Sequence, residues 1–163
     1  TDKSKALEFL SIQAINKITL AKVLLLGVGC YIFELIASYA LSIDTPQFML
    51  DIKNHTNSSF DMVMLVVAIC IVAPIIEEII FRGLAYARLV QSRAGIRGAI
   101  ILTSVVFTAI HLQYELIVLA VLLVFSFLLG YLRYKTGNLV YCIILHMQMN
   151  IFSTFDLFLF VST

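Results

Sequence analysis

The sequence predicts an all-α, polytopic membrane protein: a transmembrane bundle of about five spanning helices with an N-terminal interfacial helix. Of the 163 residues, 61% are hydrophobic and 13% are charged, whereas an average soluble domain is roughly 25% charged. The apolar residues fall into runs of about 20, the length that crosses a bilayer. With a net charge of +1, the chain lacks the basic surface that binds nucleic acid. We therefore expect the lipid bilayer, and no nucleic acid, among its partners.

Five apolar segments are long enough to be spanning helices. The expected spans are residues 18–41, 62–90, 96–112, 115–134 and 138–161. Residues 2–16 have a partly apolar face, which is typical of a helix lying at the membrane interface, and they lack the short apolar core of a cleavable signal peptide. Residues 42–61 are the only extended polar stretch, and we expect a loop there. The other connections are short, so neighbouring helices should run antiparallel.

The placement of lysine and arginine predicts the orientation. One end of the expected bundle carries Lys3, Lys5, Lys17, Arg88, Arg93, Arg97, Arg133 and Lys135. The connections at the other end carry only Lys53. Since cytoplasmic segments of membrane proteins are the ones rich in lysine and arginine, we expect an integral multi-pass protein of the cytoplasmic membrane with its N-terminus in the cytoplasm.

The chemistry of the second span centres on Glu77, Glu78 and Arg82, which follow an uncharged run from residue 62 to 76. Ionisable groups within a membrane segment usually face the bundle interior and indicate a functional site. Glu78 and Arg82 are four residues apart, so they share a helix face and can pair. Glu77 is rotated by about 100° from Glu78, which leaves it free for chemistry. Pro74, one turn earlier, predicts a kink.

Two later spans carry His111 and His146, the only histidines expected within the membrane. Phe107 precedes His111 by four residues, and Asn150 follows His146 by four. Each histidine alone is best explained by packing, and the asparagine by interhelical hydrogen bonding. By the helical rise, however, Glu77 and the two histidines lie about 17–23 Å from the basic ends of their helices. We therefore expect the three side chains to meet at one depth.

A carboxylate and two imidazoles at one point would form a hydrolytic site that uses water directly. The carboxylate suits a general base, one imidazole can orient the water, and the other imidazole with a nearby amide can stabilise an oxyanion. Two histidines and a glutamate are also a zinc ligand set with an open position, although the helical HExxH spacing is absent. Glu77, His111 and His146 are thus also candidate ligands for a divalent metal such as zinc, and both forms of water activation stay open.

Three motifs resemble those of the CPBP (Abi) intramembrane proteases, a family that includes the CAAX prenyl endopeptidases. They are Glu77-Glu78-x-x-x-Arg82 followed by Gly83, Phe107-x-x-x-His111, and His146-x-x-x-Asn150. Three motifs in this order and on these helices are specific, and the resemblance covers about residues 62–155. It implies a catalytic core of four transmembrane helices at residues 62–163. Residues 1–61 would supply the interfacial helix, the first transmembrane helix and an extracytoplasmic loop.

The resemblance also implies a role for each motif residue: Glu77 and His111 would activate water, His146 and Asn150 would stabilise the tetrahedral oxyanion, and Glu78, Arg82 and Phe107 would support the site. The implied activity is an intramembrane endopeptidase that cuts a peptide or prenylated-protein substrate, in CAAX-type or bacteriocin-related processing. The competing hypothesis is a non-proteolytic membrane scaffold or self-immunity protein whose polar residues only hold the helices together. A third hypothesis is a metal or proton conduit through the bundle.

Overall fold

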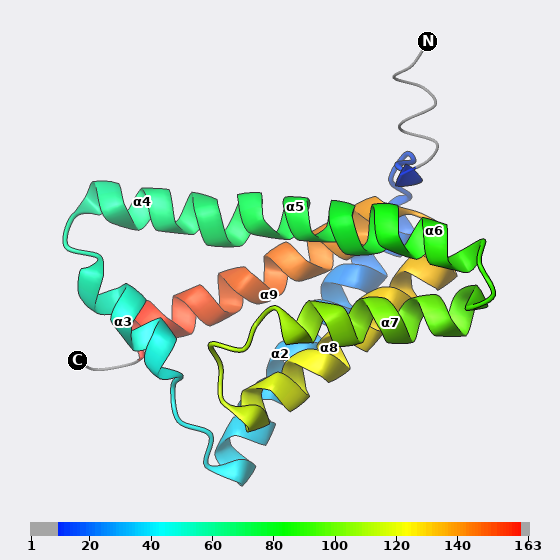
Figure 1. The fold of residues 1–163 in the computed structure, drawn as a ribbon. Coiled ribbons are helices and arrows are strands. Elements are labelled where there is room, and N and C mark those ends of the chain that lie inside the picture. The colour runs from blue at the N-terminus through cyan, green and yellow to red at the C-terminus, as the bar shows by residue number, and fades with distance from the viewer. Residues whose placement is uncertain (1–9, 161–163) are drawn as a thin grey trace.

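The computed structural model describes residues 10–160, and every regular element within them is a helix (Figure 1). This confirms the predicted all-α bundle. The elements are α2 (Lys17–Leu41), α3 (Gln47–His55), α4 (Ser59–Val67), η1 (Ala68–Val72), α5 (Ala73–Glu78), η2 (Ile79–Ala85), α6 (Tyr86–Val90), α7 (Gly95–Ala109), α8 (Leu116–Thr136) and α9 (Leu139–Leu159). The run from α4 to α6 is continuous, and η1 and η2 are wide π-helical turns within it.

Four helical runs are long and apolar enough to cross a membrane: Lys17–Leu41, Ser59–Val90, Leu116–Thr136 and Leu139–Leu159. They match four of the expected spans to within a few residues at each end. The remaining expected span, residues 96–112, corresponds to α7, which has 15 residues. At 1.5 Å per residue α7 is about 22 Å long, shorter than the hydrocarbon core of about 30 Å. It packs against α6, η2 and α8 as an apolar helix of the bundle.

The polar and apolar side chains are distributed as in a membrane protein. Large apolar side chains such as Leu25, Ile36 and Leu116 are exposed on the outside of the bundle. Charged side chains are buried at its centre, among them Glu78 and Arg82, which have no exposed surface at all. Lipid accepts the apolar exterior, whereas charges at membrane depth are tolerated only where protein surrounds them.

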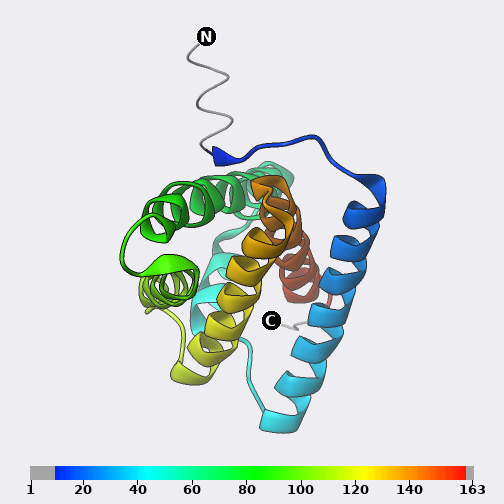
Figure 2. The same ribbon diagram turned by 90° about the vertical axis from the view of Figure 1, so that its right-hand side faces the viewer.

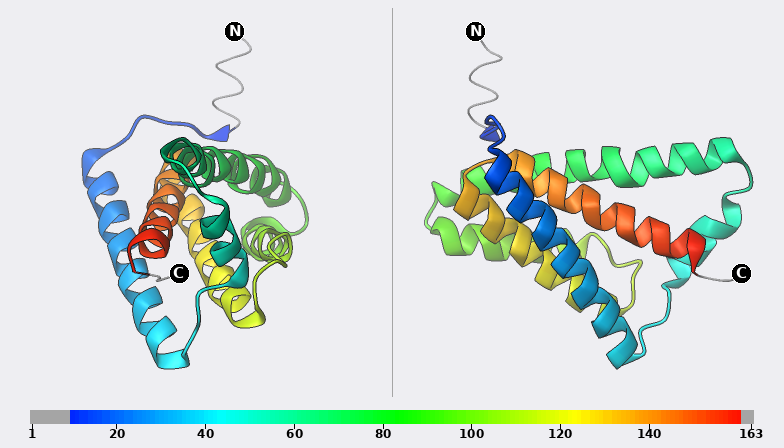
Figure 3. Two further views of the ribbon diagram at one scale, coloured as in Figure 1. Left: turned by 90° about the vertical axis from the view of Figure 1, so that its left-hand side faces the viewer. Right: turned by 180° about the vertical axis from the view of Figure 1, so that it is seen from behind.

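Helix α9 lies in the middle of the bundle, between α2, α8 and the α4–α6 run (Figures 2 and 3). The core that α9 shares with α2 and α8 consists of Val23, Leu129, Leu132, Tyr141, Cys142 and Leu145. On its other side α9 contacts α5, η1 and η2. This arrangement brings the glutamates of α5 next to the histidine of α9.

The expected interfacial helix at residues 2–16 is wrong for residues 12–16, whereas Leu10 is helical. Residues 1–9 lie outside the described residues, and residues 12–16 are non-helical. They lie along the α8–α9 turn, where Asn138 accepts a hydrogen bond from the Gln13 backbone N–H at 3.3 Å and donates one to its carbonyl at 3.1 Å. The Leu139 N–H likewise donates to the Ser11 carbonyl at 3.0 Å. These bonds satisfy backbone groups that a short helix would have paired internally.

The expected loop at residues 42–61 is also wrong in part, because it contains the helix α3 and the start of α4. Ser58 and Asp61 form a capping box at the start of α4, in which the side chain of each residue accepts a hydrogen bond from the backbone N–H of the other. A nine-residue helix such as α3 is too short to be stable by its intrinsic propensity. It packs against α9, and its Phe48 ring lies edge-on to Tyr114 at 5.8 Å.

We predict that Asn138→Ala lowers the free energy of unfolding by about 1–3 kcal/mol, as measured by denaturant titration in mixed micelles. The substitution removes the N-cap of α9, where Asn138 accepts from the Val140 N–H at 3.1 Å, and leaves the backbone groups of Gln13 without their partner. The matched control is Asn57→Ala, at an exposed asparagine before α4, for which we expect a change below about 0.5 kcal/mol. Equal effects of the two variants would contradict this role of Asn138.

Candidate active site

The site is built on a buried ion pair. Arg82 Nη1 donates to Glu78 Oε1 at 2.9 Å, and both side chains are fully buried. Arg82 Nη2 also donates to the carbonyl and the hydroxyl oxygens of Ser126 on α8, at 2.9 and 2.6 Å. Buried charges are costly unless they are paired and hydrogen-bonded. Arg82 therefore neutralises Glu78 and links η2 to α8; the i,i+4 spacing predicts the pair, whereas nothing in the spacing predicts Ser126.

His146 on α9 stands between the two glutamates. Its Nδ1 lies 3.0 Å from Glu78 Oε1, and an ionised carboxylate can only accept hydrogen bonds, so Nδ1 carries a proton. The other ring nitrogen, Nε2, lies 3.7 Å from Glu77 Oε2. Glu78 is fully buried, while 24% of the Glu77 side chain is exposed. The two adjacent glutamates thus differ: one is fixed in an ion pair, and the other is accessible beside an imidazole.

Phe107 on α7 supports both histidines from a fully buried position. Its ring centroid lies 4.8 Å from that of His111 and 5.8 Å from that of His146. The guanidinium carbon of Arg82 lies 4.8 Å from the same ring centroid, a cation–π contact that is stronger when the cation is desolvated. Phe107 of the second motif therefore contacts Arg82 of the first motif and His146 of the third.

His111 lies just beyond the end of α7 and is half-buried. Its Nδ1 is 2.7 Å from the Phe107 carbonyl oxygen, which can only accept, so in the neutral ring Nδ1 carries the proton and Nε2 keeps its lone pair. The Tyr114 ring stacks on His111 at 6.3 Å and 10°. Among residues 10–160, no hydrogen bond or ion pair joins His111 to Glu77. The imidazole is thus held by aromatic rings, with an unprotonated nitrogen available to water or a ligand.

The position of Asn150 follows from Pro74. The Ile69 carbonyl would normally accept a hydrogen bond from the backbone four or five residues later. The Ala73 N–H donates instead to Ala68, within the wide turn η1, and Pro74 has no N–H to give. Asn150 Nδ2 donates to this carbonyl at 2.8 Å. The proline predicted to kink the helix thus frees a carbonyl that anchors α9 to η1, and one N–H of the Asn150 amide stays available.

A cavity of about 640 Å³ has His146 and Asn150 on its wall and lies between α2, α8 and α9. Most of its lining is apolar, but Glu34 and Asp156 also line it. Asp156 Oδ1 accepts a hydrogen bond from the Tyr31 hydroxyl at 2.7 Å. Glu34, a charged residue of the first span that the motifs do not explain, is therefore a cavity residue.

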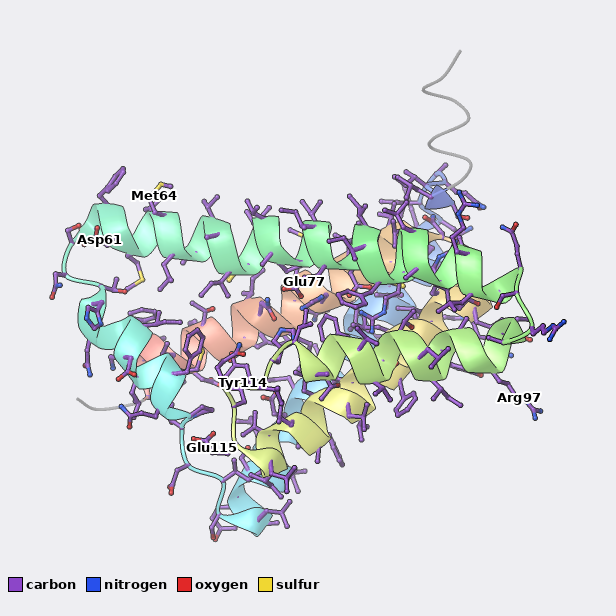
Figure 4. The ribbon with its side chains drawn as sticks, in the orientation of Figure 1. Asp61, Met64, Glu77, Arg97, Tyr114 and Glu115 are labelled. Atoms are coloured by element: carbon purple, nitrogen blue, oxygen red, sulfur yellow. The ribbon has the colours of Figure 1, made fainter. Side chains whose placement is uncertain are left out.

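Tyr114 is a site residue that the sequence analysis missed. It lies in the α7–α8 turn, lines the same cavity, and donates a weak hydrogen bond to the Met49 sulfur at 3.6 Å. In Figure 4, Tyr114 is located on the side of α5 toward which Glu77 points. Burial and the nearby Glu77 carboxylate raise the pKa of Tyr114, so the phenol is protonated at neutral pH. In the sequence, only its position three residues after His111 pointed to Tyr114. A tyrosine in a turn between helices is not specific for a functional site.

The candidate metal ligands do not converge in this arrangement. Within residues 10–160, no three histidine, cysteine, aspartate or glutamate side chains lie close enough together to hold a metal ion. Glu77 approaches His146, whereas His111 is oriented by the Phe107 carbonyl. The side chains as they lie do not fit a three-ligand zinc site, and the divalent metal stays a prediction from the sequence.

The fold and the site define a polytopic membrane protein with an acid–imidazole centre inside its helices. A family model described as "Type II CAAX prenyl endopeptidase Rce1-like" matches residues 59–152, more than half of the chain. The chain belongs to this family, which confirms the resemblance to the CPBP proteases. It is an integral membrane protein of a protease family. No curated protein and no solved structure matches the chain.

We predict that Arg82→Met lowers the free energy of unfolding by about 3–5 kcal/mol, because it leaves the Glu78 carboxylate buried without its guanidinium partner. The double variant Arg82→Met with Glu78→Gln removes both charges and should regain a large part of this loss. Denaturant titration in mixed micelles measures both values. If the double variant is as unstable as Arg82→Met, lost packing rather than an unpaired charge is responsible.

Proposed function

We propose that this protein is an intramembrane endopeptidase in which Glu77 activates water for attack on a peptide bond. The observation that supports this most directly is the difference between the adjacent glutamates. The Glu78 carboxylate is engaged by Arg82 and by His146, at 2.9 and 3.0 Å. The Glu77 carboxylate is partly exposed and faces the second nitrogen of the same imidazole at 3.7 Å. A base must reach its water, and Glu77 is the member of the pair that can.

In the proposed reaction a Glu77 oxygen takes a proton from water while the water oxygen attacks the carbonyl carbon of the substrate. His111 would orient this water through its unprotonated Nε2, since Nδ1 donates to the Phe107 carbonyl. When the carbon–nitrogen bond breaks, the proton passes from Glu77 to the leaving amine. The Glu77 carboxylate is thereby restored to its ionised form. The atoms of one water molecule are divided between the products, the hydroxyl going to the new carboxyl group and a proton to the new amine.

His146 and Asn150 are the proposed oxyanion donors. Both line the cavity, and each has one hydrogen-bonding group fixed by the protein, His146 to Glu78 and Asn150 to the Ile69 carbonyl. A second proton on His146 would balance the charges of two glutamates and one arginine and would give an Nε2–H donor. The remaining amide hydrogen of Asn150 would be the second donor. Donors fixed before the reaction stabilise developing charge at little reorganisation cost.

The proposed substrate is a membrane-associated peptide or prenylated protein, in line with the family description of a prenyl endopeptidase. The proposed location is the cytoplasmic membrane, with the N-terminus in the cytoplasm. The support is the basic character of the ends of α6 and α8 and the starts of α2 and α7 and the cytoplasmic preference of such ends.

We predict that Glu77→Gln lowers kcat by at least about 100-fold, because an amide cannot act as the base, while the thermal unfolding midpoint changes little. The assay uses purified protein in detergent with two fluorescence probes, an internally quenched farnesylated CAAX peptide and fluorescein-labelled β-casein. The matched control is Glu115→Gln, at an exposed glutamate before α8, which should keep full activity.

Full activity of Glu77→Gln, or no cleavage of either probe by the wild-type protein, would contradict the proposal. The competing hypothesis of a scaffold or self-immunity protein predicts a different result. In that case Ala substitutions at Glu77, His111 and His146 would lower stability without removing a biological activity. Measuring unfolding and cleavage on the same preparations separates the two hypotheses.

Metal dependence is tested by removing divalent ions. If Glu77 and the histidines act on water without a metal, dialysis against EDTA should leave kcat within about twofold, and elemental analysis of the active protein should find less than stoichiometric metal. If EDTA abolishes cleavage and zinc restores it, these side chains rearrange into a ligand set.

A further inference from the structure

Tyr114 connects the two parts of the proposed active site. Its ring stacks on the His111 imidazole, with centroids 6.3 Å apart and planes 10° apart. Burial and the nearby Glu77 carboxylate raise the pKa of its phenol. The same tyrosine lines the cavity that has His146 and Asn150 on its wall, whereas Glu77 and His111 do not line it. Tyr114 therefore lies between the groups proposed to activate water and the groups proposed to bind the oxyanion.

The hydroxyl group of Tyr114 has a weak hydrogen-bond partner. It donates to the sulfur of Met49 on α3 at 3.6 Å, and a thioether sulfur is a weak acceptor. A buried tyrosine hydroxyl usually has a partner, and an oxygen atom accepts from it more strongly than sulfur does. Met49 and Tyr114 both line the cavity, so this contact lies at the cavity wall. An oxygen atom of a bound substrate would be a better acceptor than the one that the hydroxyl has now.

The Tyr114 ring is held in place by two elements of the fold. His111, which stacks on it, is fixed beyond the end of α7 by the Phe107 carbonyl at 2.7 Å. Phe48 of α3 lies edge-on to it at 5.8 Å and 89°. Helix α3 lies outside residues 59–152, which the family model matches. Because the ring is held, the hydroxyl can change its acceptor by rotating its hydrogen, and a donor fixed before the reaction stabilises developing charge at little reorganisation cost.

We propose that the Tyr114 hydroxyl is a third hydrogen-bond donor to the carbonyl oxygen of the scissile peptide bond, beside His146 and Asn150. When substrate binds, the hydroxyl exchanges the Met49 sulfur for this oxygen, which becomes negatively charged as water adds to the carbonyl carbon. Tyr114 keeps its proton throughout, so the proton of the attacking water still passes through Glu77 to the leaving amine. This inference rests on the proposed function, because it adds a donor to the same site.

The substitution Tyr114→Phe tests this role, because it keeps the ring and removes only the hydroxyl. We expect kcat for the internally quenched farnesylated CAAX peptide to fall at least about tenfold, a smaller loss than for a sole donor because His146 and Asn150 remain. KM should stay within about twofold, since this donor acts on charge that develops in the transition state. The thermal unfolding midpoint in detergent should stay close to that of the wild type.

Two further variants are the controls. Met49→Leu removes the sulfur acceptor of the same hydrogen bond at nearly constant volume, and we expect it to keep kcat within about twofold of the wild type. Tyr39→Phe removes the hydroxyl of a tyrosine that is 90% exposed and should have no effect. Full activity of Tyr114→Phe would overturn the inference. An equal loss of kcat in Met49→Leu would also overturn it, because the hydroxyl would then act only by binding α3.

Glu77→Gln, assayed in the same series, separates this inference from the proposed function. If the wild type cleaves the peptide, Glu77→Gln does not, and Tyr114→Phe is fully active, the proposed function stands and the third donor is refuted. If the wild type cleaves neither the farnesylated peptide nor fluorescein-labelled β-casein, the proposed function is refuted and the inference falls with it.

Discussion

The rest of the structure depends on the neutralisation of one buried carboxylate, that of Glu78. A charge at this depth needs a partner and hydrogen bonds, and Arg82 supplies both from four residues further along the same helix. Because Arg82 also binds Ser126 on α8 and lies over the Phe107 ring on α7, the same interaction fixes the positions of three helical segments. His146 from α9 completes the set by binding the same Glu78 oxygen. The contacts of Glu78 with Arg82 and His146 therefore hold the helices together, whether or not the site is catalytic.

The irregular backbone of the α4–α6 run has a comparable effect. Pro74 and the wide turn η1 leave the Ile69 carbonyl without a helical donor, and Asn150 binds it from α9. In the second wide turn, η2, the Tyr86 N–H bonds to Phe81, and the Arg82 carbonyl accepts a hydrogen bond from Arg133 on α8 at 3.0 Å. Wide turns of this kind often occur at functional sites. Here they provide backbone acceptors for polar side chains of neighbouring helices, on both sides of the glutamate pair.

The proposed chemistry depends on the different roles of the two adjacent glutamates. Glu78 orients His146, and Glu77 lies at the second nitrogen of that ring with part of its surface exposed. Membership of a prenyl endopeptidase family agrees with hydrolysis. The family thus supports the reaction class, and the geometry of the glutamate pair supports Glu77 as the base.

The helical class, the bounds of four spans, the Glu78–Arg82 pair and the family could be predicted from the sequence, because hydrophobic run length, i,i+4 spacing and short motifs are local properties. The sequence did not predict the segment at residues 12–16, the helix α3, Ser126 as a partner of Arg82, or Tyr114 beside His111. Each of these depends on contacts between residues far apart in the chain, or on a ring orientation that spacing leaves undetermined. Helix rotation and packing set which faces meet, so the folded structure was needed to show that His146 lies between the two glutamates and hydrogen-bonds to Glu78. It was needed equally to show that the three candidate metal ligands do not form a metal site and that the cavity lies between α2, α8 and α9.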